Sequence, residues 1–250
     1  AKFMARNLYR WFVYYNIDAD VESTVIEPMA DILRQNNYEI QPALTALLKS
    51  EHFYHDNAIG AMIKSPVDFT MSTIKPFVIT TNLNLNQTYQ LWFSLHTVNT
   101  TMQQDVFTPP DVAGWKAYYQ DPVFYRYWIN SVTLTTRRAL TDGMATSMNA
   151  FFNKPYGIDV IRVVDGIPNS QDPVVMIQAL IDLLLPYQLT QAQLDYLKDV
   201  LIPGLPDFEW TVEYGAYLND PTNTIIRMGV ENRLKALFTA LLGLAEFELQ

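Results

Sequence analysis

Two of the three histidines lie close together in the sequence, beside two acidic residues. His52 and His55 are three positions apart, and Glu51 and Asp56 flank them. On a helix this spacing would place two imidazoles and a carboxylate on one face, where they could bind a transition metal. Metal sites of this layout usually carry a longer motif and a further ligand. We therefore favour a solvated helix end and expect no metal or other cofactor.

The third histidine and the other acidic residues form no catalytic pattern in the sequence. His96 lies within an apolar stripe, which favours a core histidine with satisfied hydrogen bonds. The chain contains no motif for a serine nucleophile, a zinc hydrolase, a phosphate loop or a dinucleotide site. Acid pairs for glycoside hydrolysis assemble in space and leave no spacing signal. The nominal candidates for such a pair are Glu51, Asp56, Asp105, Asp111 and Asp121.

The segment from residue 107 to 115 combines two prolines, a glycine and a tryptophan within nine residues. Pro109 and Pro110 fix the backbone, and Asp111 can accept amide hydrogens as a turn or helix cap. Gly114 permits a positive φ angle or a close backbone approach, and Trp115 would close the turn. We therefore predict a rigid turn that organises the neighbouring helices.

Aromatic residues are concentrated directly after this turn. They could line a groove for sugars or a peptide, or they could seal the turn against the core. Both interpretations fit the sequence. The candidate binding residues are Trp115, Tyr118, Tyr119, Tyr125 and Trp128, with Phe124 and Tyr127 among them in the chain.

Composition excludes several classes of function. The chain has 250 residues, no cysteine and a net charge of -9. The absence of cysteine excludes thiol catalysis, disulfides and Cys-ligated zinc. A nucleic-acid surface needs clustered Lys and Arg, which this acidic chain lacks. Its longest uncharged apolar run, residues 236–245, is about half of the roughly 20 residues that span a bilayer, so we expect no transmembrane helix. The oligomeric state is left open.

Apolar periodicity and capping residues predict an all-α fold. We expect a multi-helix bundle of roughly 8–10 helices with the Pro-rich turn and at most a short β element near residues 158–164. Residues 1–152 would form a helical domain that carries the turn, 153–171 a loop or linker, and 172–250 a C-terminal helical part packed on the first within one globule. The predicted helices cover residues 2–15, 24–37, 41–50, 65–79 with a kink at Pro76, 86–104, 121–140, 172–186, 190–203 and 220–249.

The Pro109 to Trp115 turn, followed by Trp128-Ile129 and Arg137, resembles the bacterial family known as domain of unknown function 1800 (DUF1800). Other segments resemble the same family, so the similarity touches most of the chain. They are residues 3–13, 47–53, 64–66 and 244–250. Family members are commonly about twice this length, so we expect the chain to be a C-terminal half. Two positions depart from the family: residues 116–127 replace a short Gly-rich link, and Asn7 stands where a lysine is usual.

The resemblance implies an extracytoplasmic bacterial protein, secreted or periplasmic, with a sulfatase-like partner and no established activity or catalytic residues. We expect a non-catalytic binding or scaffolding domain, with the aromatic surface at residues 115–128 contacting a glycan or a protein. The alternative is part of a hydrolase whose remaining active-site residues lie in a further N-terminal portion. We expect a shared structural motif of Pro109, Pro110, Asp111, Gly114, Trp115 and Arg137, with an ion pair from Asp111 to Arg137.

Overall fold

The computed structural model describes residues 1–77, 83–121, 124–146 and 157–250, and helices dominate all four ranges. Within these ranges the structure contains no β-strand, and its one β element is an isolated antiparallel bridge between Ile63 and Leu249. The all-α prediction is therefore confirmed. The α-helical segments, α1 to α13, outnumber the expected 8–10 because several of them are only one or two turns long.

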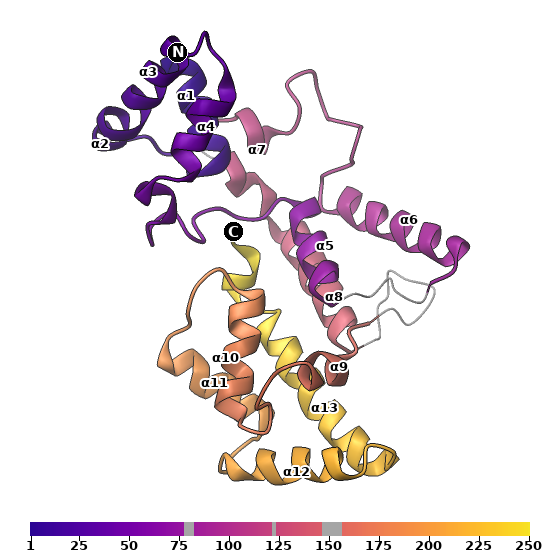
Figure 1. Cartoon of the computed structure of the whole chain (residues 1–250). Helices are drawn as coiled ribbons and strands as arrows, with labels where there is room; N and C mark the ends of the chain where they lie inside the picture. The colour runs from indigo at the N-terminus through magenta and orange to yellow at the C-terminus, as the bar shows by residue number, and fades with distance from the viewer. Residues whose placement is uncertain (78–82, 122–123, 147–156) are drawn as a thin grey trace.

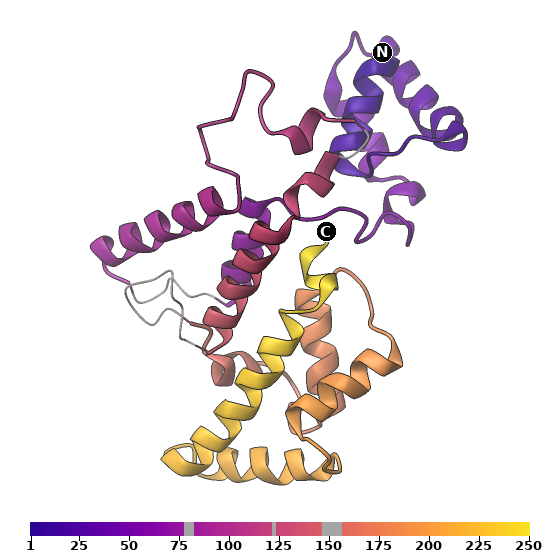
Figure 2. The ribbon, with the colours of Figure 1, turned by 180° about the vertical axis from the view of Figure 1, so that it is seen from behind.

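The first helices enclose an apolar core of their own, which we call the N-terminal lobe (residues 2–48). Ala5 and Tyr9 pack there against Ile26, Leu33 and Leu47, all of which are buried. The lobe gathers around the N-terminus, apart from the long central helices (Figures 1 and 2). Its elements are α1 (Lys2–Phe12), α2 (Ala19–Val21), a π turn (Glu22–Ile26), α3 (Glu27–Gln35) and α4 (Ile40–Leu48).

A second, larger core begins at Phe69 and ends at Phe247, and we call this part the main lobe. α13 crosses it and contacts α8, α9, α11 and α12. The helices are α5 (Pro66–Ile74), α6 (Leu85–Thr101), α8 (Ser131–Thr146), α9 (Val160–Asp165), α10 (Pro173–Leu184), α11 (Gln191–Leu201), α12 (Phe208–Asn219) and α13 (Thr224–Leu241).

Three helix starts in the main lobe follow the predicted caps, whereas α12 was not predicted and α13 has its cap at Asn223 instead of at residue 220. The side chains of Ser65, Asp172 and Thr190 each accept a hydrogen bond from a backbone N–H in the first turn of the following helix. After α5 the chain continues as a 3-10 turn (Lys75–Phe77), where the kink at Pro76 was expected. Ile79, the predicted end of that helix, lies outside the described residues.

Two further predictions need correction. Residues 160–165 form helix α9 instead of a strand, because the carboxylate of Asp159 accepts the N–H of Arg162 and caps a helix. The helix predicted over 121–140 is interrupted: a 3-10 helix (Phe124–Trp128) precedes α8, with residues 122–123 outside the described ranges. The amide oxygen of Asn130 accepts the N–H groups of Val132 and Thr133 and so starts a new helix there.

Helix α6 is apolar on two faces. Leu91, Leu95 and Val98 are buried, whereas Trp92 lies on the outer face with 46% of its surface exposed. His96 shares that outer face, and its Nε2 lies 3.4 Å from a carboxylate oxygen of Asp105. The expectation of a core histidine is therefore wrong: the stripe that contains it faces solvent.

The domain division at 153–171 stays a prediction, and residues 147–156 lie outside the described ranges. The part of the chain that the structure describes shows a different grouping, with one apolar core before residue 48 and another after residue 68. Helix α7 (Lys116–Tyr119) and the 3-10 helix at 124–128 lie beside the N-terminal lobe, far from it in sequence (Figure 1). These two elements form the junction between the lobes.

Within the described ranges, no helix is both long and apolar enough to cross a lipid bilayer, as expected.

Candidate functional site

A cavity of about 690 Å³ lies at this junction, and we call it the junction cavity. Its walls come from α1 and the turn after it, from α7 with the 3-10 helix, and from residues 62–68. Its aromatic lining consists of Trp11, Tyr15, Tyr118, Tyr119, Phe124, Tyr125 and Trp128. Its polar lining consists of Asn7, Arg10, Ser65, Asp68, Asp121 and Gln250.

The aromatic side chains contact each other between the N-terminal lobe and the junction elements. The rings of Trp11 and Tyr118 are 5.1 Å apart, and Tyr118 meets Trp128 edge-on at 5.5 Å. On the other side, Tyr15 meets Tyr125 edge-on at 5.5 Å. Such tilted and edge-on pairs are the favoured aromatic arrangements, so the rings stabilise the junction as well as lining the cavity.

The floor of the junction cavity is a connected polar network. The hydroxyl of Ser65 donates to a carboxylate oxygen of Asp68 at 2.7 Å, and Ser65 is also hydrogen-bonded to Tyr118. Gln104 donates its amide to the Tyr118 hydroxyl at 3.2 Å and accepts the N–H of Val67 at 2.9 Å. Burial raises the pKa of Tyr118, while its hydrogen bonds with Ser65 and Gln104 act in the opposite direction. The phenol is therefore held in place as a neutral hydrogen-bonding group.

A buried ionic cluster lies next to this polar network. Arg137, with none of its surface exposed, donates to Glu248 at 2.7 Å and to the carbonyl of Lys64 at 2.8 Å. Lys64 donates its ammonium to the carbonyl of Phe247 at 2.7 Å. Backbone hydrogen bonds between Met62 and Gln250, one in each direction, also join the 62–68 segment to the C-terminal segment. This C-terminal clamp (Lys64, Arg137, Phe247 and Glu248) fixes the segment at 62–68 that lines the cavity.

The clamp perturbs the titration of its members. Burial lowers the pKa of Lys64 to about 8, although the nearby Glu248 carboxylate opposes this shift. Burial also raises the pKa of Glu248, against the attraction of Arg137.

The lysine shift predicts a pH dependence of stability. Between about pH 8 and the ordinary lysine pKa of 10.5, the unfolded chain binds more protons at this position than the folded chain. Its contribution to the free energy of unfolding therefore rises with pH in this window, by at most about 1.4 kcal/mol per pH unit. We expect urea denaturation at pH 8 and 9.5 to show this rise relative to a Lys64→Met variant. Equal pH slopes for both proteins would contradict it.

The Pro-rich turn stands out from the body between α6 and α7 (Figures 1 and 2). Gly114 has a φ of 88°, in the region that favours glycine, as expected. Asp111 accepts the N–H of Ala113 at 2.7 Å and the hydroxyl of Tyr119 at 3.0 Å. Trp115 meets Tyr118 edge-on at 6.3 Å. The turn thus orients two tyrosines of the cavity wall.

The expected ion pair between Asp111 and Arg137 is wrong. Arg137 is buried and pairs with Glu248, whereas Asp111 is exposed and accepts hydrogen bonds inside its own turn and from Tyr119. A buried guanidinium needs a partner within its own enclosed environment, which the C-terminal segment provides.

Asp111→Ala is therefore expected to be mild. It removes a turn hydrogen bond, which lowers the free energy of unfolding by about 1 kcal/mol. Its effect should add to that of Arg137→Met, because the two side chains share no partner. Urea denaturation of both single variants and the double variant measures this. A coupling energy above about 1 kcal/mol would restore a direct link between them.

The structure brings four of the five candidate binding residues, Tyr118, Tyr119, Tyr125 and Trp128, to the junction cavity. The fifth, Trp115, is half-buried and lines a neighbouring cavity of about 290 Å³ with Pro110, Tyr127 and Trp128. Trp128 is buried while Tyr118 and Tyr119 are exposed, and ligand binding by these residues stays a prediction.

Sequence reasoning missed the contribution of α1 and of the 62–68 segment. Trp11 and Tyr15 fit the apolar spacing of an amphipathic helix, which suggested core positions, yet Trp11 is 58% exposed. Asp68 fits the first turn of a helix, and this position gave no sign that its side chain lines a cavity. Of the nominal acids, only Asp121 lines the cavity.

The histidine cluster forms no metal site in the described residues, where no group of three His, Cys, Asp or Glu side chains could hold an ion. The Nε2 of His52 is hydrogen-bonded to the Tyr9 hydroxyl at 2.9 Å. His55 accepts the N–H of Asn57 through Nδ1. These two imidazoles have local structural partners.

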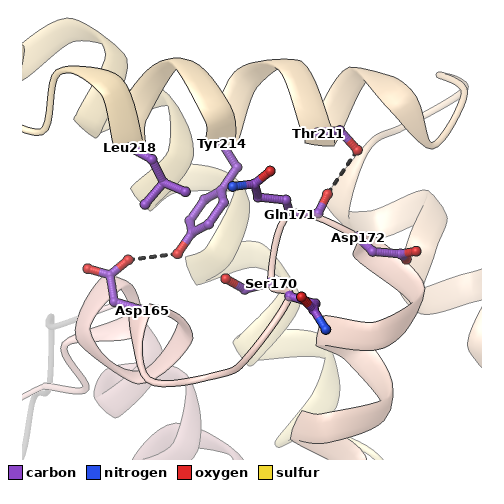
Figure 3. Close-up of a pocket in the computed structure, with 8 residues that line it drawn as sticks. Asp165, Ser170, Gln171, Asp172, Thr211, Tyr214 and Leu218 are labelled. Atoms are coloured by element: carbon purple, nitrogen blue, oxygen red, sulfur yellow. Dashed lines mark hydrogen bonds between the residues drawn. The ribbon is translucent and has the colours of Figure 1, made fainter.

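A second cavity, of about 570 Å³, lies between α12 and the loop before α10 (Figure 3). Its polar groups bond to each other: Tyr214 donates to Asp165 at 2.7 Å, and Thr211 donates to the carbonyl of Gln171 at 2.8 Å. Asp165 also accepts the hydroxyl of Tyr217 at 3.0 Å. These bonds hold the loop on α12, so we assign this cavity a structural role.

A family model described as "Protein of unknown function (DUF1800)" matches residues 1–247. The family expected from the sequence is confirmed, but the description as a C-terminal half is slightly off, because the match covers essentially the whole chain. No curated protein and no solved structure matches the chain.

Proposed function

Because the chain belongs to the DUF1800 family, whose function is unknown, we propose a function from its junction cavity: this protein binds a glycan there. The observation that carries the proposal is the aromatic lining contributed by the N-terminal lobe and by the junction elements. Trp11 and Tyr15 come from the N-terminal lobe and the turn after α1, while Tyr118, Tyr119 and Tyr125 come from the junction elements.

The lining has the chemistry that sugars require. The C–H faces of a sugar ring are apolar and fit against aromatic rings, whose large flat surfaces contribute much of the burial energy. Sugar hydroxyls need nearby donors and acceptors, which Asn7, Arg10 and Asp68 offer. The volume of about 690 Å³ lies in the range of small-molecule sites, and sites often occur between lobes. A segment of a few sugar units fits this description.

Two expectations from the family resemblance accompany this proposal. An extracytoplasmic location, secreted or periplasmic, is consistent with a glycan ligand, and we propose it on that ground. A sulfatase-like protein partner stays a prediction.

The test is binding of the full chain to a glycan array, followed by titration of the best ligand. Tyr118→Ala removes a central ring of the wall and should weaken binding by about 30-fold or more, the size typical of an interface anchor. Trp92→Ala is the matched control, because Trp92 is an exposed aromatic residue on α6 that does not line the cavity. It should bind like the unmodified protein.

Two results would contradict the proposal. One is that no glycan binds the folded chain, and the other is that Tyr118→Ala and Trp92→Ala weaken binding equally. Circular dichroism of both variants establishes that they are folded.

A hydrolase is the second candidate, and one observation favours it: the carboxylates of Asp68 and Asp121 line the same cavity. Glycosidases use two such groups, one as acid and one as nucleophile or base. If the chain cleaves its ligand, incubation with the bound polysaccharide releases reducing ends, and Asp68→Asn or Asp121→Asn abolishes the release. If the glycan is bound but no reducing ends are released, the chain binds its ligand without cleaving it.

A further inference from the structure

We propose that the glycan carries protonated amino groups, as in an oligosaccharide of amino sugars with free amines. This inference rests on the proposed glycan-binding function. It follows from the carboxylates and aromatic faces of the junction cavity, which together suit a cationic sugar better than a neutral one.

The first carboxylate, Asp68, is exposed at the cavity floor and forms no ion pair within the described residues. Ser65 donates to its Oδ2. The cations that act on Asp68 electrostatically are Lys64 and Arg137, and both donate their hydrogen bonds to other groups of the C-terminal clamp. Its negative charge therefore remains available to a ligand in the cavity.

The second carboxylate, Asp121, follows α7 and is also exposed. In the described part of the chain it too has no ion-pair partner. The chain as a whole carries a net charge of -9, so the field around it favours the approach of a cation. A concave site with two carboxylates strengthens that preference locally.

The aromatic rings of this region already bind cations within the protein. The guanidinium of Arg10 lies over the Phe124 ring at 5.7 Å, and that of Arg126 lies over the Tyr15 ring at 5.5 Å. An ammonium group gains the same attraction from a ring face within about 6 Å. The walls can therefore receive the charged edge of an amino sugar as well as its apolar face.

One positive group, Arg10, lines the cavity against the two carboxylates. Its Nε donates to the carbonyl of Tyr15 at 3.3 Å, and its guanidinium lies over the ring of Phe124. Among the described residues that line the cavity directly there are two carboxylates and one guanidinium, and the second guanidinium, that of Arg126, lies over the Tyr15 ring. Arg10 is thus suited to donate to a sugar hydroxyl while the carboxylates bind the amines.

The experiment is calorimetric titration of the full chain with three tetrasaccharides: one of glucosamine, one of N-acetylglucosamine and one of glucose, all β-1,4-linked. We expect the amine form to bind at least about tenfold more tightly, since bonds to charged groups are stronger than neutral ones. Its affinity should fall as salt increases, while that of the neutral forms should not.

Asp68→Asn and Asp121→Asn should each reduce the preference for the amine by about tenfold. Asp105→Asn, a matched change outside the cavity, should leave the preference unchanged. Because Asp68 also lies in the first turn of α5, the Asp121 variant supplies a test that does not depend on that helix start.

The outcomes separate this inference from the proposed function. Equal or tighter binding of a neutral tetrasaccharide overturns the amine preference and leaves the glycan-binding function standing. Failure of every glycan on the array and in the titration overturns both. An amine preference that survives both Asn substitutions also overturns the inference, because the carboxylates would not be its source.

Discussion

Replacing Arg137 by methionine lowers the free energy of unfolding by about 3–5 kcal/mol, one of the two largest effects that we expect in this chain. The guanidinium is fully buried and holds two partners, the carboxylate of Glu248 and the carbonyl of Lys64. Its loss leaves the acidic side chain without its cation and the carbonyl without that donor. Burial of an uncompensated charge is the main cost. Urea denaturation at pH 7 measures the change.

The matched control removes the charge that Arg137→Met leaves behind. In the double variant Arg137→Met, Glu248→Met, no unpaired carboxylate remains, and a well-packed apolar pair can replace a buried ion pair at little cost. The double variant should therefore be more stable than Arg137→Met alone. If the single variant loses less than about 1 kcal/mol, the clamp does not hold the C-terminal segment.

Replacing Trp210 by alanine should cost about 3–5 kcal/mol, the usual range for a buried tryptophan. Its ring is fully buried and stacks on Tyr214, with 5.1 Å between the centroids and an angle of 17°. Its indole N–H donates to the carbonyl of Ser170 at 2.9 Å, which holds the loop before α10. The variant therefore loses packing and leaves that carbonyl without its donor.

Trp210→Phe separates these two losses, because it keeps an aromatic ring and removes only the donor and part of the volume. We expect it to be destabilised by about 1–3 kcal/mol. Thermal and urea denaturation of both variants provide the comparison. Equal losses for the two variants would show that ring packing contributes little at this position.

The two stability predictions differ in their consequence for the site. Trp210 lies in the main lobe beside the second cavity, so Trp210→Ala variants that remain folded should still bind a glycan. Arg137 fixes the segment at 62–68, which forms the cavity floor. Arg137→Met should therefore weaken glycan binding even at temperatures where the chain is folded.

Local chemistry explains why several of the helix starts were predictable. A cap forms between residues two or three positions apart, as at Ser65 and Thr190, so the sequence contains both partners of the hydrogen bond. The same holds for Gly114, whose positive φ depends on its own lack of a Cβ atom. The β element predicted near residues 158–164 shows the limit of this reasoning, because Val160, Ile161, Val163 and Val164, the four β-branched residues of α9, also fit a short helix.

Contacts between distant segments were not predictable in this way. The partner of Arg137 is Glu248, 111 positions away, and the nearer Asp111 was as plausible from charge alone. Apolar spacing located the stripes of α1 and α6, but spacing does not say which stripe faces a partner helix. Trp11 and His96 consequently lie exposed on faces that looked internal.

The sequence by itself therefore determined the helical class, the caps, the Pro-rich turn and the family, because these depend on residue types over a few positions or on short motifs. Only the tertiary structure decided that the aromatic residues after the turn meet α1, and that Asp68 and Asp121 share one cavity. Those neighbours follow from how the two lobes pack, which is set by the sum of many weak contacts across the chain. The candidate site is therefore formed only by the tertiary packing of the chain.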